Sequence, residues 1–305
     1  MPFTLFADTR AALARDSLHG LSVGDALGSQ FFVPGRRPAD LAAGRFPPPP
    51  WQWTDDTEMA CSVVAELTEV GEIDRDRLAL AFAHRCEPYR GYGPGAVTIL
   101  RLIRTGTPWP VAAASAFDGQ GSCGNGAAMR VGPLGAWFAD STRQAAAQAR
   151  ASAEVTHAHP EGIAGAVAVA VAAALATRAR LDGDRPPPSR LLAAVAAALD
   201  PGEVHQGVRR AAGLLGRPLA VAVDALGNGS RVTAQDTVPF TLWAATTHLD
   251  DYPAAIRACV EAGGDVDTTA AIVGAVVAAH TGVGTPGGVP ADWLAAREPL
   301  PDWVA

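Results

Sequence analysis

Apolar residues recur at three- and four-residue spacings along most of this chain, within segments that are rich in alanine. This spacing places the apolar side chains on one face of a helix, which can then pack against a core. The pattern predicts helices over residues 58–70, 76–86, 143–153, 161–180, 189–199, 206–215, 253–262 and 268–281. No segment alternates apolar and polar residues convincingly over the length of a strand. We therefore predict an all-α protein.

Proline and glycine interrupt the apolar pattern and indicate where helices are connected. Loops are predicted at residues 34–50, 91–95, 183–189 and 282–290. None is long and polar enough to be an evident interdomain linker, and the chain has no fixed-period repeat. With 305 residues, of which 49% are apolar and 18% charged, the chain can bury a substantial core. We expect one domain spanning residues 1–305.

Charge and cysteine usage narrow the class of protein. The net charge of -7 argues against nucleic acid as a partner. The four cysteines are scattered without a C-x-x-C pair, which favours free thiols in a reducing compartment. The N-terminus lacks a signal-peptide pattern, and the apolar stretch at residues 163–176 is shorter than the roughly 20 residues that span a bilayer. We expect a cytoplasmic protein without a membrane partner, and the sequence leaves its oligomeric state unknown.

Two acidic pairs, each accompanied by threonine, directly precede apolar helical segments: WTDDTEMA at residues 53–60 and GGDVDTTAAIVG at residues 263–274. Thr54 is a natural N-cap, and the helix macrodipole favours acidic residues in a first turn. Capping explains one acid at each position and leaves the second as surplus. Carboxylate, hydroxyl and water oxygens are also the ligands that Mg²⁺ and Mn²⁺ prefer. On spacing alone, capping and metal binding are equally good explanations.

The spacing within the two pairs differs. If the chain approaches the second helix in an extended conformation, Asp265 and Asp267 point to the same side, and Thr268 follows at the helix start. Asp55 and Asp56 are adjacent, so they point in different directions and each could reach a different ion. Four carboxylates and two hydroxyls suit a two-metal site with ions about 3.5 to 4 Å apart.

A glycine-rich stretch, GSCGNGAAMRVGPLG at residues 121–135, is a third candidate site. Gly121, Gly124 and Gly126 permit positive φ and close backbone approach, and a helix-like apolar run begins near Ala127. Such a loop can present backbone N–H groups to a phosphate. An ordinary glycine-rich turn is the alternative, and without further motifs it is the better interpretation.

His157 and His159 precede the long alanine-rich helical segment and can bond a ribose or phosphate oxygen. With Glu161 they suggest zinc, but no further strong ligand is nearby, so we set zinc aside.

Glycines 20, 24 and 28 recur every four residues and give a helix one smooth side for close packing. Asp25 in such a helix must find a hydrogen-bond donor or a cation if it is buried.

Five motifs, in this order, resemble those of the ADP-ribosylglycohydrolase family, which includes dinitrogenase reductase-activating glycohydrolase. The motifs are GLSVGDALG, WTDDTEMA, GNGAAMRVGPLG, TH and GGDVDTTAAIVGA, between residues 16 and 282. Each motif alone is weak, whereas five in order are highly specific. The resemblance implies a compact, single-domain orthogonal helical bundle with a binuclear Mg²⁺ or Mn²⁺ site, and it favours metal binding over capping alone.

The resemblance also implies roles for particular residues. Metal ligands are implied at Thr54, Asp55, Asp56, Asp265, Asp267 and Thr268. Contacts with ADP-ribose are implied at Gly124, Asn125, Gly126, Ala127, Met129 and His157. Arg130 belongs to the same motif, or serves as a structural partner for a buried acid such as Asp25.

The implied activity is hydrolysis of the bond between C1 of the distal ribose of ADP-ribose and an acceptor. The substrate is an ADP-ribosylated protein or a small ADP-ribosyl conjugate, and we expect arginine, rather than serine, as the acceptor. The ions orient the ribose hydroxyls and activate a water, whose proton Asp56 or Asp265 takes. Surrounding carboxylates stabilise the oxocarbenium-like transition state.

One position departs from the family pattern. Many members carry a glutamate four residues after GDALG, where it gates the site, and this chain has Phe32 there. Unless Glu58 or another acid substitutes, the alternative function is ADP-ribose binding or regulation without catalysis. A diphosphate enzyme of the terpene synthase type is a weaker alternative, because Met59 stands where its acidic motif needs an acid.

Overall fold

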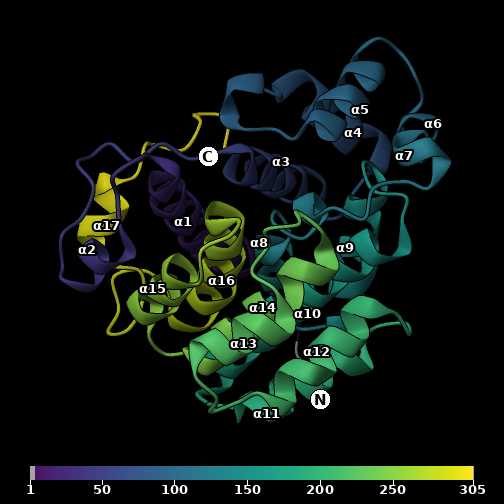
Figure 1. The fold of residues 1–305 in the computed structure, drawn as a ribbon. Coiled ribbons are helices and arrows are strands. Elements are labelled where there is room, and N and C mark those ends of the chain that lie inside the picture. The colour runs from purple at the N-terminus through teal and green to yellow at the C-terminus, as the bar shows by residue number, and fades with distance from the viewer. Residues whose placement is uncertain (1–3, 305) are drawn as a thin grey trace.

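The computed structural model describes residues 4–304, and within them the regular structure is helical, with isolated bridges but no strand (Figure 1). The all-α prediction is therefore confirmed. The α-helices are α1 (Ala7–Ser29), α2 (Pro38–Ala42), α3 (Asp55–Val70), α4 (Arg75–Arg85), α5 (Pro94–Arg104), α6 (Trp109–Ala114), α7 (Ala116–Gly119), α8 (Gly132–Trp137), α9 (Thr142–Glu154), α10 (Pro160–Asp182), α11 (Pro188–Ala197), α12 (Glu203–Gly213), α13 (Leu219–Leu226), α14 (Ala234–Thr247), α15 (Tyr252–Ala262), α16 (Val266–Thr281) and α17 (Ala291–Ala296). Three short 3₁₀ helices are η1 (Gln30–Phe32), η2 (Pro88–Arg90) and η3 (Asn125–Ala127).

Every helix that the apolar spacing predicts is present, and its ends lie within three residues of the predicted ends: α3, α4, α9, α10, α11, α12, α15 and α16. The pattern does not predict α14, because Pro239 inside that helix is typical of a helix end. Pro94 and Pro188, placed in predicted loops, are instead the first residues of α5 and α11. Proline is tolerated there because the first-turn N–H groups have no partner within the helix.

Helices α1 and α16 lie side by side, and glycine makes their close contact possible (Figure 1). A Cβ atom at Gly24 would lie 2.2 Å from the carbonyl oxygen of Ala270, and one at Gly28 would lie 2.7 Å from that of Val266. The expected smooth side of a helix is therefore confirmed. Because α16 begins at Val266, this contact also brings Asp25, near the end of α1, to the start of α16.

Helix α10 spans 23 residues and, by length and composition alone, is apolar enough to cross a membrane. Within the protein, 78% of its most apolar stretch of 18 residues is buried. It packs against α8, α9, α14 and α16. Its apolar surface is thus covered by the protein's own helices, as that of a core helix is.

Two predicted features differ from the structure. The loop predicted at residues 34–50 contains the short helix α2. The helix-like run expected from Ala127 is interrupted, since η3 ends at Ala127 and α8 begins at Gly132. Pro133 explains the break, because it has no N–H to continue a helix and is suited to starting one.

The segment after α17 is tied to the loop that follows η2. Both terminal nitrogens of Arg90 donate to the carboxylate of Glu298, at 2.8 and 3.0 Å, and the guanidinium carbon lies 3.4 Å from the centre of the Trp53 ring. The next residue, Gly91, lies beside the start of α3, since a Cβ atom there would be 3.5 Å from Oδ1 of Asp55. Glu298 therefore helps to fix this loop beside Asp55.

All four cysteines are free, in agreement with their scattered positions in the sequence. Cys61 and Cys259 are buried, whereas Cys86 and Cys123 are half-buried. Burial raises the pKa of the Cys86 thiol to about 11, which disfavours its reactive thiolate form.

Candidate active site

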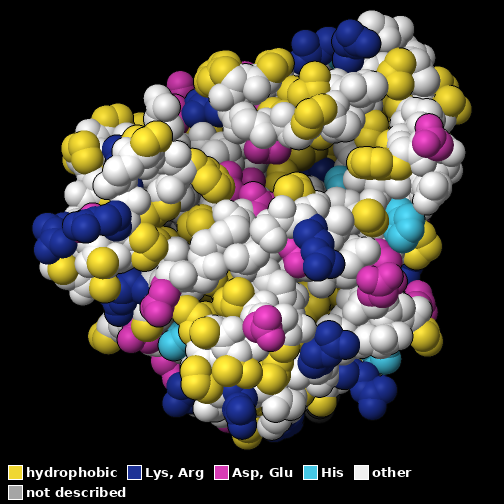
Figure 2. Space-filling model, in the orientation of Figure 1, with side chains coloured by type: hydrophobic (Ala, Val, Ile, Leu, Met, Phe, Trp, Pro, Cys, Tyr) yellow, Lys and Arg dark blue, Asp and Glu magenta, His cyan; other side chains and the backbone are white. Residues whose placement is uncertain are grey.

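Three helix ends that are far apart in the sequence meet at one acidic cluster. Asp25 comes from α1, Asp56 from the first turn of α3, and Asp267 from the first turn of α16. One carboxylate oxygen of each lies within 4.8 Å of the other two. Figure 2 shows acidic side chains at the bottom of a hollow in this face of the molecule. The structure thus brings the two predicted acidic pairs together and adds Asp25 to them.

Asp25 is fully buried, and its carboxylate holds the start of α3. It accepts hydrogen bonds from the Thr54 N–H at 2.9 Å, the Thr57 N–H at 3.1 Å and the Thr57 hydroxyl at 2.5 Å. The Thr54 hydroxyl also lies within hydrogen-bond distance, at 2.8 Å. The donors that a buried acid requires therefore come from the TDDT motif.

Asp56 lies between two of the predicted threonine ligands. Its Oδ2 is 3.2 Å from the Thr54 hydroxyl and 3.4 Å from the Thr268 hydroxyl. Its Oδ1 is buried and has no hydrogen-bond partner. A buried carboxylate oxygen without a donor is costly, so this atom is suited to binding a cation.

Capping accounts for only part of the two motifs. Thr54 is the N-cap of α3 and accepts a hydrogen bond from the N–H of Asp56 at 3.4 Å. Asp265 occupies the N-cap position of α16, but its side chain caps nothing; Oδ2 instead accepts from the amide of Asn125 at 2.7 Å. The expected extended approach to α16 is wrong at Asp267, because the helix already begins at Val266. The acids nevertheless face one cluster, since they lie in the first turn or at its cap.

Burial raises the pKa of every carboxyl group in the cluster above the ordinary value of 3.8. The pKa of Asp25 is about 6, and that of Asp55 is about 7 because the charge of Asp25 adds to the effect of burial. Burial and neighbouring carboxylates raise the pKa of Asp56 and Asp267 well above 3.8. The pKa of Asp265 is also raised by burial, although its hydrogen bond with Asn125 opposes the shift.

The donor set of the cluster fits a hard divalent cation. None of the ion pairs formed within residues 4–304 involves its five carboxylates. Their negative charge is therefore not balanced by arginine or histidine. Oxygen is the only ligand atom offered, by carboxylates and threonine hydroxyls, which is the set that Mg²⁺ and Mn²⁺ prefer.

The glycine-rich loop lies against this cluster through Asn125. Besides Asp265, the Asn125 amide donates to the Thr237 hydroxyl at 3.1 Å, and its N–H donates to the carbonyl of Val232 at 3.2 Å. Of the three glycines that permit positive φ, Gly121 adopts it and Gly124 and Gly126 do not. A Cβ atom at Gly124 or at Gly126 would lie 3.5 Å from Nε2 of His157, an ordinary contact distance, so the imidazole ring lies directly against this loop.

The predicted ligand contacts divide into two groups. Asn125 and His157 are buried residues whose polar atoms lie at the loop, beside the half-buried Gly124 and Gly126. The side chains of Ala127 and Met129 belong to the hydrophobic core. They support the loop from within.

His159 and Glu161 have structural partners of their own. His159 is the N-cap of α10, and its Nδ1 accepts from the N–H of Glu161. The Glu161 carboxylate accepts from the N–H groups of Glu203 and Val204, both at 2.8 Å, at the start of α12. These contacts agree with setting a zinc site aside.

Arg130 does not pair with a buried acid, so the pairing suggested with Asp25 is wrong. The fully buried guanidinium donates to the carbonyl of Ser152 at 2.6 Å and to the hydroxyl of Thr156 at 3.0 Å. Its central carbon lies 4.4 Å from the centre of the Phe82 ring. Neutral acceptors and an aromatic face thus take the place of a carboxylate.

Glu58 does not reach into the hollow as a replacement for the glutamate missing at Phe32. Its side chain is buried, and Oε2 accepts from the Tyr92 hydroxyl at 2.5 Å and from the N–H of Glu87 at 3.0 Å. Glu58 therefore anchors the loop between α4 and α5. Phe32, in η1, is 54% exposed and carries no carboxylate.

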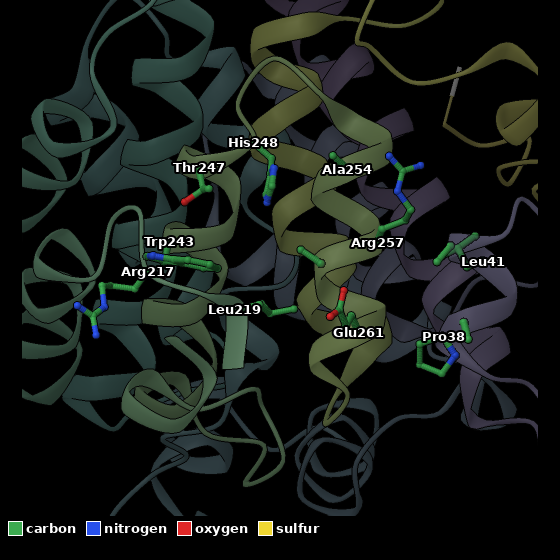
Figure 3. A pocket seen from close by; sticks show the side chains of 13 residues that line it. Pro38, Leu41, Arg217, Leu219, Trp243, Thr247, His248, Ala254, Arg257 and Glu261 are labelled. Atoms are coloured by element: carbon green, nitrogen blue, oxygen red, sulfur yellow. The ribbon is translucent and has the colours of Figure 1, made fainter. Parts of the chain in front are cut away.

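A separate cavity of about 750 Å³ lies beside α2, α14 and α15 (Figure 3). Its lining combines Trp243 and Leu219 with the charged side chains of Arg217, Arg257 and Glu261. No residue of the acidic cluster lines it. The converging carboxylates therefore lie outside this cavity.

A second Gly-Asn-Gly turn, at residues 227–229, was not predicted as part of the site. The carbonyl of Asn228 accepts from the N–H of Asp265 at 3.2 Å, and its side-chain amide donates to the carbonyl of Ala262 at 2.9 Å. The turn thereby positions Asp265 at the start of α16. The only signal in the sequence is the tripeptide itself, which is typical of any tight turn.

Comparisons with known proteins agree with the five motifs. The sequence profile of the ADP-ribosylglycohydrolase family matches residues 7–305. Human ADP-ribosylhydrolase ARH3 is 27% identical over 274 residues, which cover 79% of this chain and 73% of that protein. An uncharacterized protein of Archaeoglobus fulgidus is 31% identical over 279 residues, covering 86% and 85%. A solved structure described as an ADP-ribosylglycohydrolase-related protein complex matches with a TM-score of 0.65 and 28% identity, over 95% of this chain and 94% of that one.

Proposed function

The chain belongs to the ADP-ribosylglycohydrolase family, and from that premise we propose that it hydrolyses the bond between ADP-ribose and the side chain of arginine on a modified protein. A small ADP-ribosyl conjugate is the second substrate class. The observation that carries the proposal is the acidic cluster, in which five buried or half-buried carboxylates converge without a basic partner.

Two divalent cations, magnesium or manganese, fit the cluster. Thr54, Asp55 and Asp56 would hold them from the start of α3, and Asp265, Asp267 and Thr268 from the start of α16. When bound, the cations supply Lewis acidity and orient the ribose hydroxyls. The raised pKa values of the carboxyl groups agree with this assignment, because they reflect burial first and then the charge of neighbouring carboxylates.

Residues of the chain perform the remaining steps. Asp56 or Asp265 accepts the proton of the attacking water. The other carboxylates stabilise positive charge that develops at the anomeric carbon. The loop at residues 124–126, together with His157, binds the ADP-ribose beside the cluster, since Asn125 of this loop donates a hydrogen bond to Asp265.

A second function, binding of ADP-ribose without catalysis, is favoured by one observation. Phe32 is exposed at the position of the usual glutamate, while Glu58 is engaged with Tyr92. The two functions therefore predict different results in the same assay. An enzyme that cleaves arginine conjugates without that glutamate releases ADP-ribose, whereas a binding protein does not.

The deciding experiment measures release of free ADP-ribose from arginine-ADP-ribosylated protein with Mg²⁺, Mn²⁺ or EDTA. Asp265→Ala is the test variant, and Asp200→Ala is the matched control, because the Asp200 side chain is 86% exposed. Metal-dependent release that Asp265→Ala abolishes and Asp200→Ala retains supports the hydrolase. Metal-dependent binding of ADP-ribose without release from arginine or serine conjugates, by the wild type and by Phe32→Glu alike, supports the binding protein.

A further inference from the structure

A chain of hydrogen bonds leads from the buried Arg130 through Thr156 to the ring of His157. A terminal nitrogen of Arg130 donates to the Thr156 hydroxyl oxygen at 3.0 Å. The same oxygen lies 2.8 Å from Nδ1 of His157. Arg130 and Thr156 are both buried, with 0% and 2% of their surface exposed, so water does not substitute for these contacts.

Arg130 can only donate. A guanidinium has five N–H groups and no acceptor atom. Although burial lowers its pKa to about 9, the group is still protonated at pH 7. The Thr156 oxygen must therefore act as the acceptor in this contact, and its own hydrogen remains to be placed.

The hydrogen of the Thr156 hydroxyl has one acceptor available. Within residues 4–304, Thr156 Oγ1 contacts only Arg130 and Nδ1 of His157. If Nδ1 carried a proton, two donors would point at Oγ1 and the buried hydroxyl hydrogen would have no acceptor, which is unfavourable. Every donor has an acceptor only when the Thr156 hydroxyl donates to an unprotonated Nδ1.

The other ring nitrogen faces the glycine-rich loop. Nε2 lies 3.5 Å from where a Cβ atom would stand at Gly124 and at Gly126, and no described residue bonds it. Burial and the charge of Arg130 lower the pKa of His157 to about 3, so the ring is neutral at pH 7. A neutral ring without a proton on Nδ1 carries it on Nε2.

We propose that Arg130 and Thr156 are positioning residues that hold His157 in the Nε2–H tautomer, so that the ring donates a hydrogen bond to a phosphoryl or hydroxyl oxygen of the ligand. The identity of the ligand as ADP-ribose rests on the proposed function, whereas the tautomer rests on the contacts behind the ring. His157 then serves as a neutral donor and not as a base.

The test is a long-range ¹H–¹⁵N NMR spectrum of the full-length protein labelled with ¹⁵N-histidine at pH 7. The chain has seven histidines, and the His157 signals are identified as those missing from His157→Asn. We expect a pyridine-like Nδ1 and a pyrrole-like, protonated Nε2. A protonated Nδ1, or an imidazolium, would overturn the proposal. His157→Gln provides the same identification if His157→Asn does not fold.

Variants of Thr156 then test the origin of the tautomer. Thr156→Val removes the hydroxyl at nearly constant volume and should give a mixture of tautomers, whereas Thr156→Ser should retain the wild-type signals. Thr177→Val is the matched control, because this equally buried hydroxyl bonds only the Ala173 carbonyl of its own helix. A single Nε2–H tautomer in Thr156→Val would show that Thr156 does not set it.

Titration with ADP-ribose tests the donor role. We expect the Nε2 signal to shift on binding and Thr156→Val to weaken binding about tenfold, as loss of a supporting hydrogen bond does at other sites, with Thr156→Ser close to wild type. An unshifted Nε2 signal at saturation would overturn the donor role. Failure of the proposed hydrolysis is distinguishable, because neither the tautomer nor the binding measurement depends on turnover.

Discussion

The two halves of the site are built on opposite principles. The acidic half, made by Asp25, Asp55, Asp56, Asp265 and Asp267, consists of acceptors whose pKa values are raised and whose charge has no basic partner. The loop half, made by residues 124–126 with His157 and Thr156, is joined to the fold by paired donors and acceptors, and the pKa of its imidazole is lowered.

This difference indicates what each half still needs. The acidic half holds repelling groups together because α1, α3 and α16 force them into contact, so a cation would complete it. In the loop half, Nε2 of His157 has no hydrogen-bond partner within residues 4–304 and can meet a ligand, and this half requires no charge from outside. The four predictions below test this contrast, from the largest expected effect to the smallest.

Asp56→Asn should have opposite effects on activity and on stability. We expect the rate of ADP-ribose release to fall by more than about 100-fold, because even the partners of metal ligands are commonly worth about 10- to 100-fold. Thermal unfolding in EDTA should nevertheless occur at a higher temperature than in the wild type, because one buried charge is removed. If activity and stability both fell, Asp56 would be a structural acid and the contrast between the halves would fail.

Magnesium should stabilise the protein more at pH 8 than at pH 5. The folded-state pKa values of Asp25, about 6, and Asp55, about 7, lie above the ordinary 3.8, so the folded protein binds these protons more tightly than the unfolded chain. In EDTA, the free energy of unfolding should therefore fall as the pH rises from about 4 to 7. Calorimetry at one fixed Mg²⁺ concentration, 100 times the Kd measured at pH 8, should recover about 2.7 kcal/mol at pH 8 and less at pH 5. An equal gain at both pH values would contradict the prediction.

Gly24→Ala should disturb the acidic half through α1. The added Cβ would lie 2.2 Å from the Ala270 carbonyl oxygen, so α1 must move away from α16 and carry Asp25 with it. We expect a loss of about 2 kcal/mol of unfolding free energy and weaker Mg²⁺ binding. Gly213→Ala is the control, because nothing lies within 4 Å of a Cβ there. Equal effects of Gly24→Ala and Gly213→Ala on Mg²⁺ binding would show that the position of α1 does not affect the acidic half.

Asn125→Ala should weaken the connection between the halves. The variant loses the amide that donates to Asp265 at 2.7 Å and to Thr237 at 3.1 Å. We expect kcat/KM to fall about tenfold, and to fall further in Asn125→Asp, which places a like charge beside Asp265. Steady-state kinetics with isothermal titration of Mg²⁺ measure both effects. Tighter Mg²⁺ binding by Asn125→Asp would contradict this prediction, because it would indicate that a carboxylate at position 125 acts as a further metal ligand.

The sequence predicts most of the helical framework because burial of one face produces a regular apolar spacing, as in α12 and α15. It does not predict α14, where Pro239 is accommodated inside the helix. Within the site, the motifs identify Asp56 and Asp267 as related acids although 211 positions separate them. Such pairs are recognisable because both begin a helix with a surplus carboxylate.

Other features depend on contacts that no local pattern encodes. Asp25 joins the cluster because glycine contacts place α1 against α16, and Arg130 is satisfied by a carbonyl and a hydroxyl where an acid was expected. A carbonyl acceptor leaves no trace in the sequence, since every residue has one. Partners of this kind can be identified only when the fold is known.

The contact between Arg90 and Glu298 has an evolutionary consequence. The two residues lie 208 positions apart, yet the guanidinium is 9% exposed and depends on this carboxylate for two hydrogen bonds. A lineage that lost Glu298 would leave a buried cation beside the loop next to Asp55. Positions 90 and 298 should therefore change together among related chains, and their substitutions should record selection for the geometry of that loop.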